Sequence, residues 1–278
     1  MKKLLCTILA LVMVCSLCSC ACGSKEKVTY GFLEEDMGSE TYAIGFRLGD
    51  EELAETVSAA VKALVKNGTY AEIGAKYETI QDYLILKPED FSDDEIAEEG
   101  SGDPNFTFKH GFDLDYPPYS YLLDDGSVGG FDVELCQAVC DYLGWGYEPV
   151  PFNWDFKDAE LNAGSCDCIW SGFTKETRED DYTWGITYSS NTQMIMVASN
   201  SGIETLADLE GKIVGVQIGT SALTMLEDDR ADLAETFGDL KIYDTYTTAF
   251  NDLKAGAIDA IAIDVTAGTH LIANTEGK

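Results

Sequence analysis

The chain has 278 residues, of which 50 are acidic and only 18 are basic, giving a formal net charge of −32. Such a charge repels phosphate backbones, so the composition argues against nucleic acid or another acidic polymer as a partner. It favours solubility but says little about the fold, and the length allows one or two domains.

Residues 1–19 have the pattern of a secretory leader. Lys2 and Lys3 precede the apolar run LLCTILALVMVCSL, which is as long as a signal-peptide core and shorter than the ~20 residues of a membrane span. The run ends in LCSC, which resembles the lipobox of bacterial lipoproteins and would make Cys20 the acylated first residue. An ordinary cleaved secretion signal is the alternative. We expect a lipid anchor outside the cytoplasm, because residues 20–27 form a polar tether.

Residues 28–85 predict two strands followed by two helices. VTYGF and TYAIGFRL have the composition of strands, whereas DEELAETVSAAVKALVKNG and TYAEIGAKYETIQDYLI have that of helices. Asp50 is placed to cap the first helix, and Gly68 separates the two. Residues 86–104 are strongly acidic, contain Gly, Ser and Pro and have no apolar period, so they are predicted to form a linker.

From residue 105 onward, strands and helices alternate. The predicted strands are FTFKHGF, YEPVPF, CDCIWSG, TQMIMVAS, KIVGVQ, LKIYD and IDAIAID. The predicted helices are FDVELCQAVCDYLG, DFKDAELNAG, TLADLEG, SALTMLEDD, YTTAFNDLKAG and VTAGTHLIA. This order is typical of an α/β protein, in which helices cover both faces of a largely parallel sheet.

The cysteines and histidines give little reason to expect a metal or cofactor. Outside the leader and its edge the cysteines are Cys136, Cys140, Cys166 and Cys168. A four-thiolate metal site is conceivable, but structural zinc sites usually space their cysteines by two to four residues in turns. We expect small buried apolar side chains instead. His110 and His270 are far apart in the sequence, which leaves little material for a histidine-based catalytic site.

After Phe106 the sequence resembles the amino-acid-binding branch (family 3 type) of the extracytoplasmic solute receptors that feed ABC transporters. The matching pieces are GFDLDYPPYSYLLDDGSVGGFDVELCQAV, NWDFKDAELNAGSCDCIWSGFTKETRED, LADLEGKIVGVQIGTSA and LKAGAIDAIAIDVTAG. The resemblance implies a two-lobed, periplasmic-binding-protein-like (type II) α/β fold with mixed or parallel sheets. It also implies two hinge strands that cross between the lobes, within TQMIMVAS and TYAIGFR.

The order of the pieces departs from the family pattern. In the family, the helix after IAID leads through a short strand and Y-G-I-G-F-R to two closing helices. Here that closing piece, residues 28–85, precedes everything else, and joining Lys278 to Val28 would restore the family order. We therefore expect a circular permutant, which a fold tolerates where its ends are exposed and close together.

The permuted order sets the expected domain boundaries. They are residues 42–85 and 105–196 for lobe 1, 28–41 and 197–278 for lobe 2, and 86–104 for a linker. The linker could span ~60 Å when extended, against ~30 Å for a lobe. We expect it to cross lobe 1 as a poorly ordered surface strand. We also expect a monomer with Lys278 near Val28, because a long unstrained linker does not favour domain swapping.

The resemblance assigns partners to the two charged groups of a free amino acid. Arg178 would bind the α-carboxylate through its rigid fork of donors. Thr174 would add a hydroxyl and a backbone N–H, and Thr220 and Ser221 would add N–H groups from the start of a helix. Asp264 would face the ammonium group, with the Ser171 carbonyl as a second acceptor. The alternatives are a surface ion pair of Arg178 with a neighbouring acid, Glu179 or Asp180, and a helix N-cap for Thr220.

Three aromatic residues, Tyr116, Tyr119 and Trp154, are expected to wall the space around the ligand's side chain. Each could instead belong to the core. Asp113 occupies a position that can face the side chain in relatives that prefer basic amino acids, or it could cap the following turn. The sequence therefore favours a polar or cationic ligand only weakly.

These expectations combine into a lipid-anchored receptor that captures a free amino acid and delivers it to an ABC transporter permease. Because the carboxylate's partners lie on both lobes, full contact would require closure around the hinge. One alternative is an enzyme on the same fold, similar to cyclohexadienyl dehydratases, but no acid or base stands free for that chemistry. A ligand-sensing domain of a signalling system is the other alternative.

Overall fold

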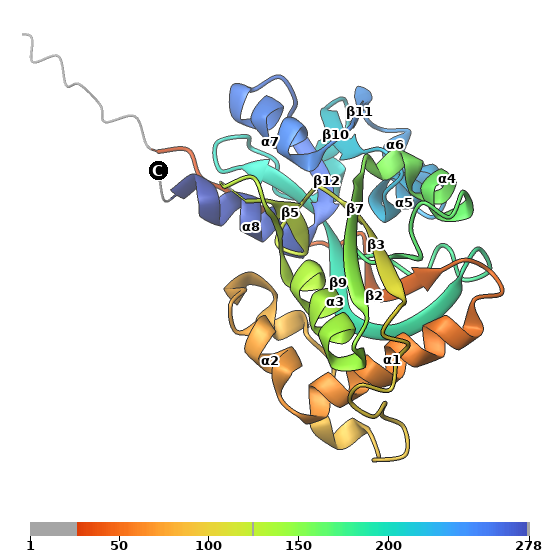
Figure 1. The fold of residues 1–278 in the computed structure, drawn as a ribbon. Coiled ribbons are helices and arrows are strands. Elements are labelled where there is room, and N and C mark those ends of the chain that lie inside the picture. The colour runs from red at the N-terminus through yellow and green to blue at the C-terminus, as the bar shows by residue number, and fades with distance from the viewer. Residues whose placement is uncertain (1–26, 124, 277–278) are drawn as a thin grey trace, which may run out of the picture.

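One curled sheet runs through the described residues, 27–123 and 125–276, of the computed structural model (Figure 1). Its strands lie in the order β11-β10-β12-β9-β2-β8-β3-β7, with β1 also paired to β9. The strand bounds are β1 (Tyr30–Phe32), β2 (Gly38–Phe46), β3 (Thr107–Asp113), β7 (Gly146–Phe152), β8 (Cys168–Ile169), β9 (Thr183–Ala198), β10 (Ile213–Gln217), β11 (Asp239–Tyr243) and β12 (Ala260–Asp264). A small second sheet contains β4 (Asp115–Tyr116), β5 (Ser120–Leu122) and β6 (Val128–Gly129).

The sheet has two parallel parts joined by antiparallel strands. We call β3, β7, β8 and their helices lobe 1, and β10, β11, β12 and their helices lobe 2. Pairing is parallel within each group, whereas β9 pairs antiparallel with β12 of lobe 2 and with β2, which in turn pairs with β8 of lobe 1. β9 and β2 contain the two segments expected to cross between the lobes.

Helices cover both groups of strands (Figure 1). They are α1 (Glu51–Lys66), α2 (Thr69–Gly74), α3 (Phe131–Leu143) and α4 (Lys157–Asn162) in lobe 1, and α5 (Ser221–Glu227), α6 (Ala231–Ala234), α7 (Tyr246–Ala255) and α8 (Val265–Glu276) in lobe 2. Short 3₁₀ turns are η1 (Glu78–Tyr83), η2 (Pro88–Asp90), η3 (Trp154–Phe156) and η4 (Leu206–Leu209). The expected α/β class is confirmed.

Two local predictions in the first segment are wrong. Asp50 makes no side-chain cap to α1 and pairs with Arg47 at 2.9 Å instead. The second predicted helix ends at Gly74 rather than continuing to residue 85. The chain turns back there, and a Cβ on Gly74 would lie only 2.4 Å from Leu84, so glycine allows the close approach.

The acidic linker is not the loose strand that was expected. The N–H of Ala97 donates to the carbonyl of Ala59 in α1, and the N–H groups of Gly100 and Gly102 donate to the last carbonyls of α3. Phe91 packs against the core, together with Ala97. At the end of α3 the linker thus satisfies backbone carbonyls that a helix end otherwise leaves unpaired.

The four cysteines beyond the leader and one of the two histidines lie in the core. All four cysteines beyond the leader are buried and free, and residues 27–123 and 125–276 contain no cluster of three or more His, Cys, Asp or Glu side chains suited to a metal ion. His110 is buried between Tyr147 and the Trp170 carbonyl, and burial lowers its pKa to about 4.

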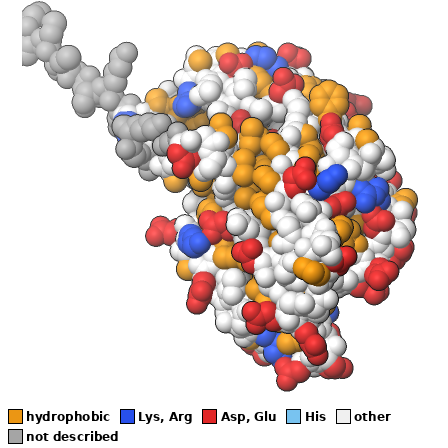
Figure 2. All heavy atoms as spheres, in the orientation of Figure 1, with side chains coloured by type: hydrophobic (Ala, Val, Ile, Leu, Met, Phe, Trp, Pro, Cys, Tyr) orange, Lys and Arg blue, Asp and Glu red, His pale blue; other side chains and the backbone are white. Residues whose placement is uncertain are grey.

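The largest apolar cluster includes side chains of both lobes, so the lobes are in contact. On the face in Figure 2, acidic side chains outnumber basic ones, as the net charge leads one to expect.

Candidate functional site

A pocket lies between the two lobes, where the expected ligand-binding residues converge. Its lining comprises Asp113, Tyr116, Trp154, Ser171, Gly172, Thr174, Arg178, Gln217, Thr220, Ser221 and Asp264. All the residues that the sequence pointed to line it, apart from Tyr119. The lobes touch around the pocket, and the remaining cavity has a volume of only about 20 Å³, room for about one water molecule.

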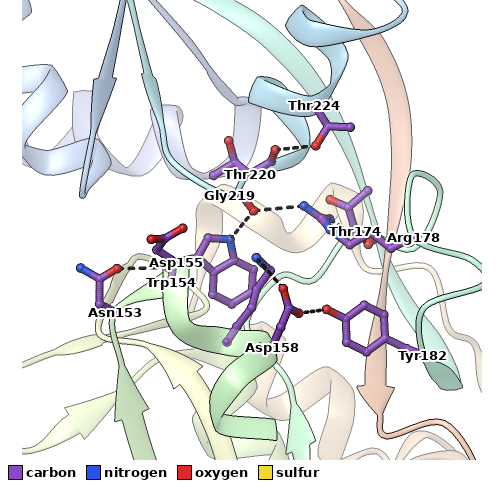
Figure 3. Close-up of polar contacts among 11 residues, drawn as sticks. Asn153, Trp154, Asp155, Asp158, Thr174, Arg178, Tyr182, Gly219, Thr220 and Thr224 are labelled. Atoms are coloured by element: carbon purple, nitrogen blue, oxygen red, sulfur yellow. Dashed lines mark hydrogen bonds and ion pairs between the residues drawn. The ribbon is translucent and has the colours of Figure 1, made fainter. Parts of the chain in front are cut away.

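Arg178 is partly buried and reaches across the pocket (Figure 3). Its guanidinium donates to the Thr174 carbonyl at 3.2 Å and to the Gly219 carbonyl of lobe 2 at 3.1 Å, and it lies 5.1 Å from the ring centre of Phe173. No ion pair involves it within the described residues, so the structure does not show the alternative of a surface pair. Charge-assisted hydrogen bonds are stronger than bonds to neutral carbonyls, so an anion that replaces these carbonyls would bind the guanidinium more strongly.

Gly219 is one of the points where the lobes meet. Its carbonyl accepts from Arg178 and also from Trp154 Nε1 at 3.0 Å, and both donors belong to lobe 1 (Figure 3). Its φ of +68° favours glycine, and a Cβ there would lie 3.2 Å from Lys157 Nζ. Glycine therefore suits the left-handed backbone conformation that presents this carbonyl to both donors.

Asp264 ends β12, a strand whose every residue is buried. Its Oδ1 accepts from Tyr42 Oη at 2.7 Å, from Asn191 Nδ2 at 2.7 Å and from Gln193 Nε2 at 2.6 Å. These donors come from β2 and β9, so the two crossing strands hold the carboxylate in place while it lines the pocket. The contacts are suited to fixing an acid that faces a ligand cation.

Glu40 of β2 is a second acid behind Asp264, and sequence reasoning missed it. It accepts from the same two amides and from Ser221 Oγ at 2.5 Å. Burial and the nearby charge of Asp264 raise its pKa to about 7. The alternation along β2 offered a signal, because Glu40 shares the buried face of the strand with Tyr42.

Asp113 and Gln217 form another polar corner of the pocket. Asp113 accepts from the N–H of Asp115 at 3.0 Å and from Gln217 Nε2 at 2.8 Å, so it both caps its turn and lines the pocket. Burial raises its pKa to about 6. Gln217 is fully buried, and its Oε1 has no hydrogen-bond partner in the described part of the chain. Sequence reasoning missed Gln217, which ends β10 next to the expected Thr220.

Thr220 and Ser221 begin α5 at the same edge. The Thr220 hydroxyl accepts from Leu223 N at 3.3 Å and donates to the Gln217 carbonyl at 2.8 Å, so the residue is a helix N-cap as well as a pocket residue. In lobe 1, Ser171 Oγ contacts Ser120 Oγ at 2.6 Å and accepts from the N–H of Asp113 at 3.2 Å. These bonds fix the pocket's small polar side chains before any ligand binds.

The aromatic walls are only partly as expected. Trp154 and Tyr116 line the pocket, and Tyr116 Oη lies 2.8 Å from Tyr42 Oη. Tyr119 does not: its side chain is 0% exposed, with its ring stacked behind Tyr116 and its hydroxyl 3.2 Å from Ser189 Oγ. It is a core residue because its ring packs against Tyr116 and its hydroxyl contacts the crossing strand β9.

Two lobes that meet around a small polar pocket, with a cation on one side and acids on the other, define a ligand-binding protein. The chain belongs to the bacterial extracellular solute-binding proteins, family 3, whose family model matches residues 108–262. It is 33% identical over 168 residues to the L-cystine-binding protein TcyJ of Escherichia coli, covering 59% of this chain and 61% of that protein.

Two further relatives support this assignment. The arginine-binding extracellular protein ArtP of Bacillus subtilis is 29% identical over 170 residues, which is 60% of this chain and 64% of ArtP. The crystal structure of an ABC uptake transporter substrate binding protein from Streptococcus pneumoniae with bound histidine superposes with a TM-score of 0.59 at 32% identity. That match covers 62% of this chain and 70% of the other. The chain thus spans about three fifths of the length of TcyJ and ArtP. These relatives are binding proteins and not enzymes.

Proposed function

We propose that this protein is a receptor that binds a free amino acid between its lobes and delivers it to an ABC transporter permease. The observation that carries the proposal is a single pocket with Arg178 on one side and Asp264 on the other. An amino acid presents an anion and a cation on neighbouring atoms, and each must exchange water for a fixed partner. Relatives that bind cystine, arginine and histidine support this ligand class.

The proposed pose replaces the contacts that Arg178 now makes. Its guanidinium would leave the Gly219 carbonyl and form a bidentate pair with the ligand's carboxylate. Thr174 would add a hydroxyl on the lobe 1 side, while the N–H groups of Thr220 and Ser221 would donate from lobe 2. The ammonium would face Asp264, with the Ser171 carbonyl as a second acceptor.

The ligand's side chain would extend toward Asp113 and Gln217, between Tyr116 and Trp154. Asp113 forms no ion pair within the described residues, and Gln217 Oε1 is an unused acceptor. Both favour a side chain that donates hydrogen bonds, and the carboxyl group favours a positive charge. We therefore propose a polar or cationic amino acid.

Binding would require the lobes to open and close. The cavity of about 20 Å³ is too small for an amino acid, so the ligand would enter only after the contacts between Gln217 and Asp113 and between Arg178 and Gly219 separate. β9 and β2 would flex as the hinge. The ligand would favour the closed form because its carboxylate contacts both lobes only there.

Mass spectrometry of small molecules released from the purified protein tests this function. A bound free amino acid is the expected result. A chemically altered product of an added cyclic acid would instead support the enzyme alternative. A ligand that lacks either the carboxylate or the ammonium group would contradict the receptor as proposed.

We also propose that the chain is a circular permutant. The family match covers residues 108–262, yet lobe 1 is completed by the earlier segment: β2 lies between β9 and β8, and α1 packs against α3. β1 pairs with β9 and packs on α8, where a Cβ on Gly268 would lie 2.8 Å from Phe32. The start of the described chain therefore lies beside α8 (Figure 1). Lys278 itself is outside the described residues.

A reordered chain tests the permutation. Residues 105–276, joined by a short Gly-Ser linker to residues 28–85, are expected to fold as a monomer with ligand affinity within about threefold of the original, since the pocket contacts are the same. Calorimetry and light scattering provide the two measurements. An aggregated or non-binding product, or an original chain that is an obligate dimer, would count against the proposal.

The lipid anchor is a separate proposal, because Cys20 lies outside the described residues. Within residues 27–123 and 125–276, no helix is sufficiently long and apolar to cross a membrane. Cys20→Ser is expected to release the protein from bacterial membranes into the medium or periplasm, because the thioether to lipid cannot form. Cys18→Ser is the matched control. Fractionation that finds the Cys20 variant still retained in membranes would exclude this residue as the acylation site.

A further inference from the structure

Two carboxyl groups lie side by side at the hinge, behind the ammonium end of the pocket. Glu40 is 3% exposed and Asp264 is 4% exposed, and they come from β2 and β12, which do not pair with each other. The pair is thus built by the hinge strand from the early segment of the chain and the last strand of lobe 2. Only Asp264 was expected at the site.

The same two amide groups bridge these acids. Asn191 Nδ2 lies 2.7 Å from Glu40 Oε1 and 2.7 Å from Asp264 Oδ1. Gln193 Nε2 lies 2.8 Å and 2.6 Å from the same two oxygens. Each amide therefore uses both of its N–H donors on the pair, and the two acid oxygens are held close together by neutral groups.

Within the described residues neither acid forms an ion pair. The hydroxyls around the two acids are neutral: Tyr42 on β2 donates to Asp264 and Ser221 on α5 donates to Glu40, while Tyr116 on β4 contacts Tyr42 and Thr266 on α8 donates to Asn191. Tyr246 on α7 lies near both acids. The pKa values of the three tyrosines are raised well above their usual value by burial and by the charge of Asp264, so these hydroxyls keep their protons.

Among the described residues that line the pocket, Arg178 is the cation whose charge acts on both acids, and it does so without contacting either of them. In the proposed function its charge is matched by the ligand's carboxylate. Two buried carboxylates that share a site without a cation of their own favour a state in which one is protonated. The position left for a balancing charge is the one that the ligand's ammonium would occupy.

We propose that Glu40 and Asp264 share one proton in the absence of ligand, and that the ammonium group of the bound amino acid displaces it. This inference rests on the proposed function and names Glu40 as a second acid of the ammonium site. In the protonated state Glu40 Oε2 would carry the proton and donate to Ser221 Oγ, which lies at 2.5 Å; on ionisation the proton would pass to solvent while the cleft is open, and Ser221 would donate to Oε2 instead. The ammonium would donate to Asp264, so one positive charge enters as another departs.

The direction of the pH effect follows from the sign of the charge. The pKa of Glu40 is raised to about 7 without ligand, and a nearby ammonium lowers the pKa of a carboxyl. Below pH 7 the ligand must displace a proton that is already bound, so affinity should fall as pH decreases. Above pH 8 the acid is already ionised, and affinity should level off.

Calorimetry in pairs of buffers with different ionisation enthalpies measures the released protons directly. The ligand is L-arginine, or the amino acid found in the purified protein if arginine does not bind. We expect release of about half a proton per ligand at pH 7 and close to none at pH 8.5. Glu40→Gln keeps the side chain's shape and should bring the release at pH 7 close to zero.

Asp132→Asn is the matched control, because Asp132 is a buried acid outside the pocket lining whose pKa is also raised to about 7. It should retain most of the release at pH 7. Binding by the unmodified chain without proton release at pH 7, or release unchanged in Glu40→Gln, would overturn the role of Glu40 while leaving the receptor intact. Absence of binding by any amino acid would contradict the proposed function itself.

Discussion

Arg178→Ala is expected to weaken amino-acid binding by about 2–5 kcal/mol, the usual effect of removing one member of a buried charge pair. That corresponds to a loss of affinity between about 30-fold and several thousand-fold. The reason is that the pocket offers the ligand's carboxylate no second contacting cation among its lining residues. Thermal unfolding should change by only a few degrees, because the guanidinium bonds only to two backbone carbonyls.

Lys175→Ala provides the matched control for Arg178. It removes the same charge three residues earlier, from a side chain that does not line the pocket, and should leave the affinity within about twofold. Isothermal titration calorimetry of both variants gives the comparison. An Arg178 variant that binds within a few-fold of the original chain would show that the carboxylate is held elsewhere.

Asp264→Asn is expected to weaken amino-acid binding by a similar amount, about 2–5 kcal/mol, because the ligand's ammonium group loses its charged partner. An asparagine Oδ1 can still accept from Tyr42, Asn191 and Gln193, so the change removes the charge and largely preserves the contacts of the fold. Competition binding measures the change in affinity, and circular dichroism during heating checks the fold.

Asp244→Asn serves as the control for Asp264, since it neutralises an exposed acid of the same lobe outside the pocket. It should bind as the original chain does. If Asp264→Asn binds equally well while its melting temperature is unchanged, Asp264 does not contact the ammonium group. If both variants bind poorly, the effect comes from the overall charge.

Local sequence patterns sufficed for most of the fold. Strands and helices alternate visibly from residue 105, and Gly68 separates α1 from α2 with a φ of +94°. The docking of the linker was not predictable, because it depends on Ala59 within α1 and on the end of α3, which are far away in the sequence. The early end of α2 likewise depends on Leu84 packing against Gly74.

In the pocket, too, some residues could be predicted from the sequence and others could not. Residues within family motifs, such as Arg178 and Asp264, could be named from the sequence. The alternation along β2 places Glu40 on a buried face, but not at the site. The roles of Glu40 and Gln217 come from partners more than a hundred positions away: Ser221 and Asp264 for Glu40, and Asp113 for Gln217. Tyr119 is an aromatic residue of the type that walls a pocket, but its side chain faces the core. The sequence of a short loop does not determine the direction of a side chain, which is fixed only when the lobe is assembled.

The most direct test of the central claim compares a free amino acid with two blocked forms of it. The amino acid found in the purified protein, or L-arginine, would be titrated alongside its methyl ester and its Nα-acetyl derivative. In this account Arg178 binds the ligand's carboxylate and Asp264 binds its ammonium group. The free form is therefore expected to bind, and each blocked form is expected to lose at least about 30-fold in affinity. Equal binding of the free form and either blocked form would contradict the account, because one of the two charges would then have no partner in the pocket.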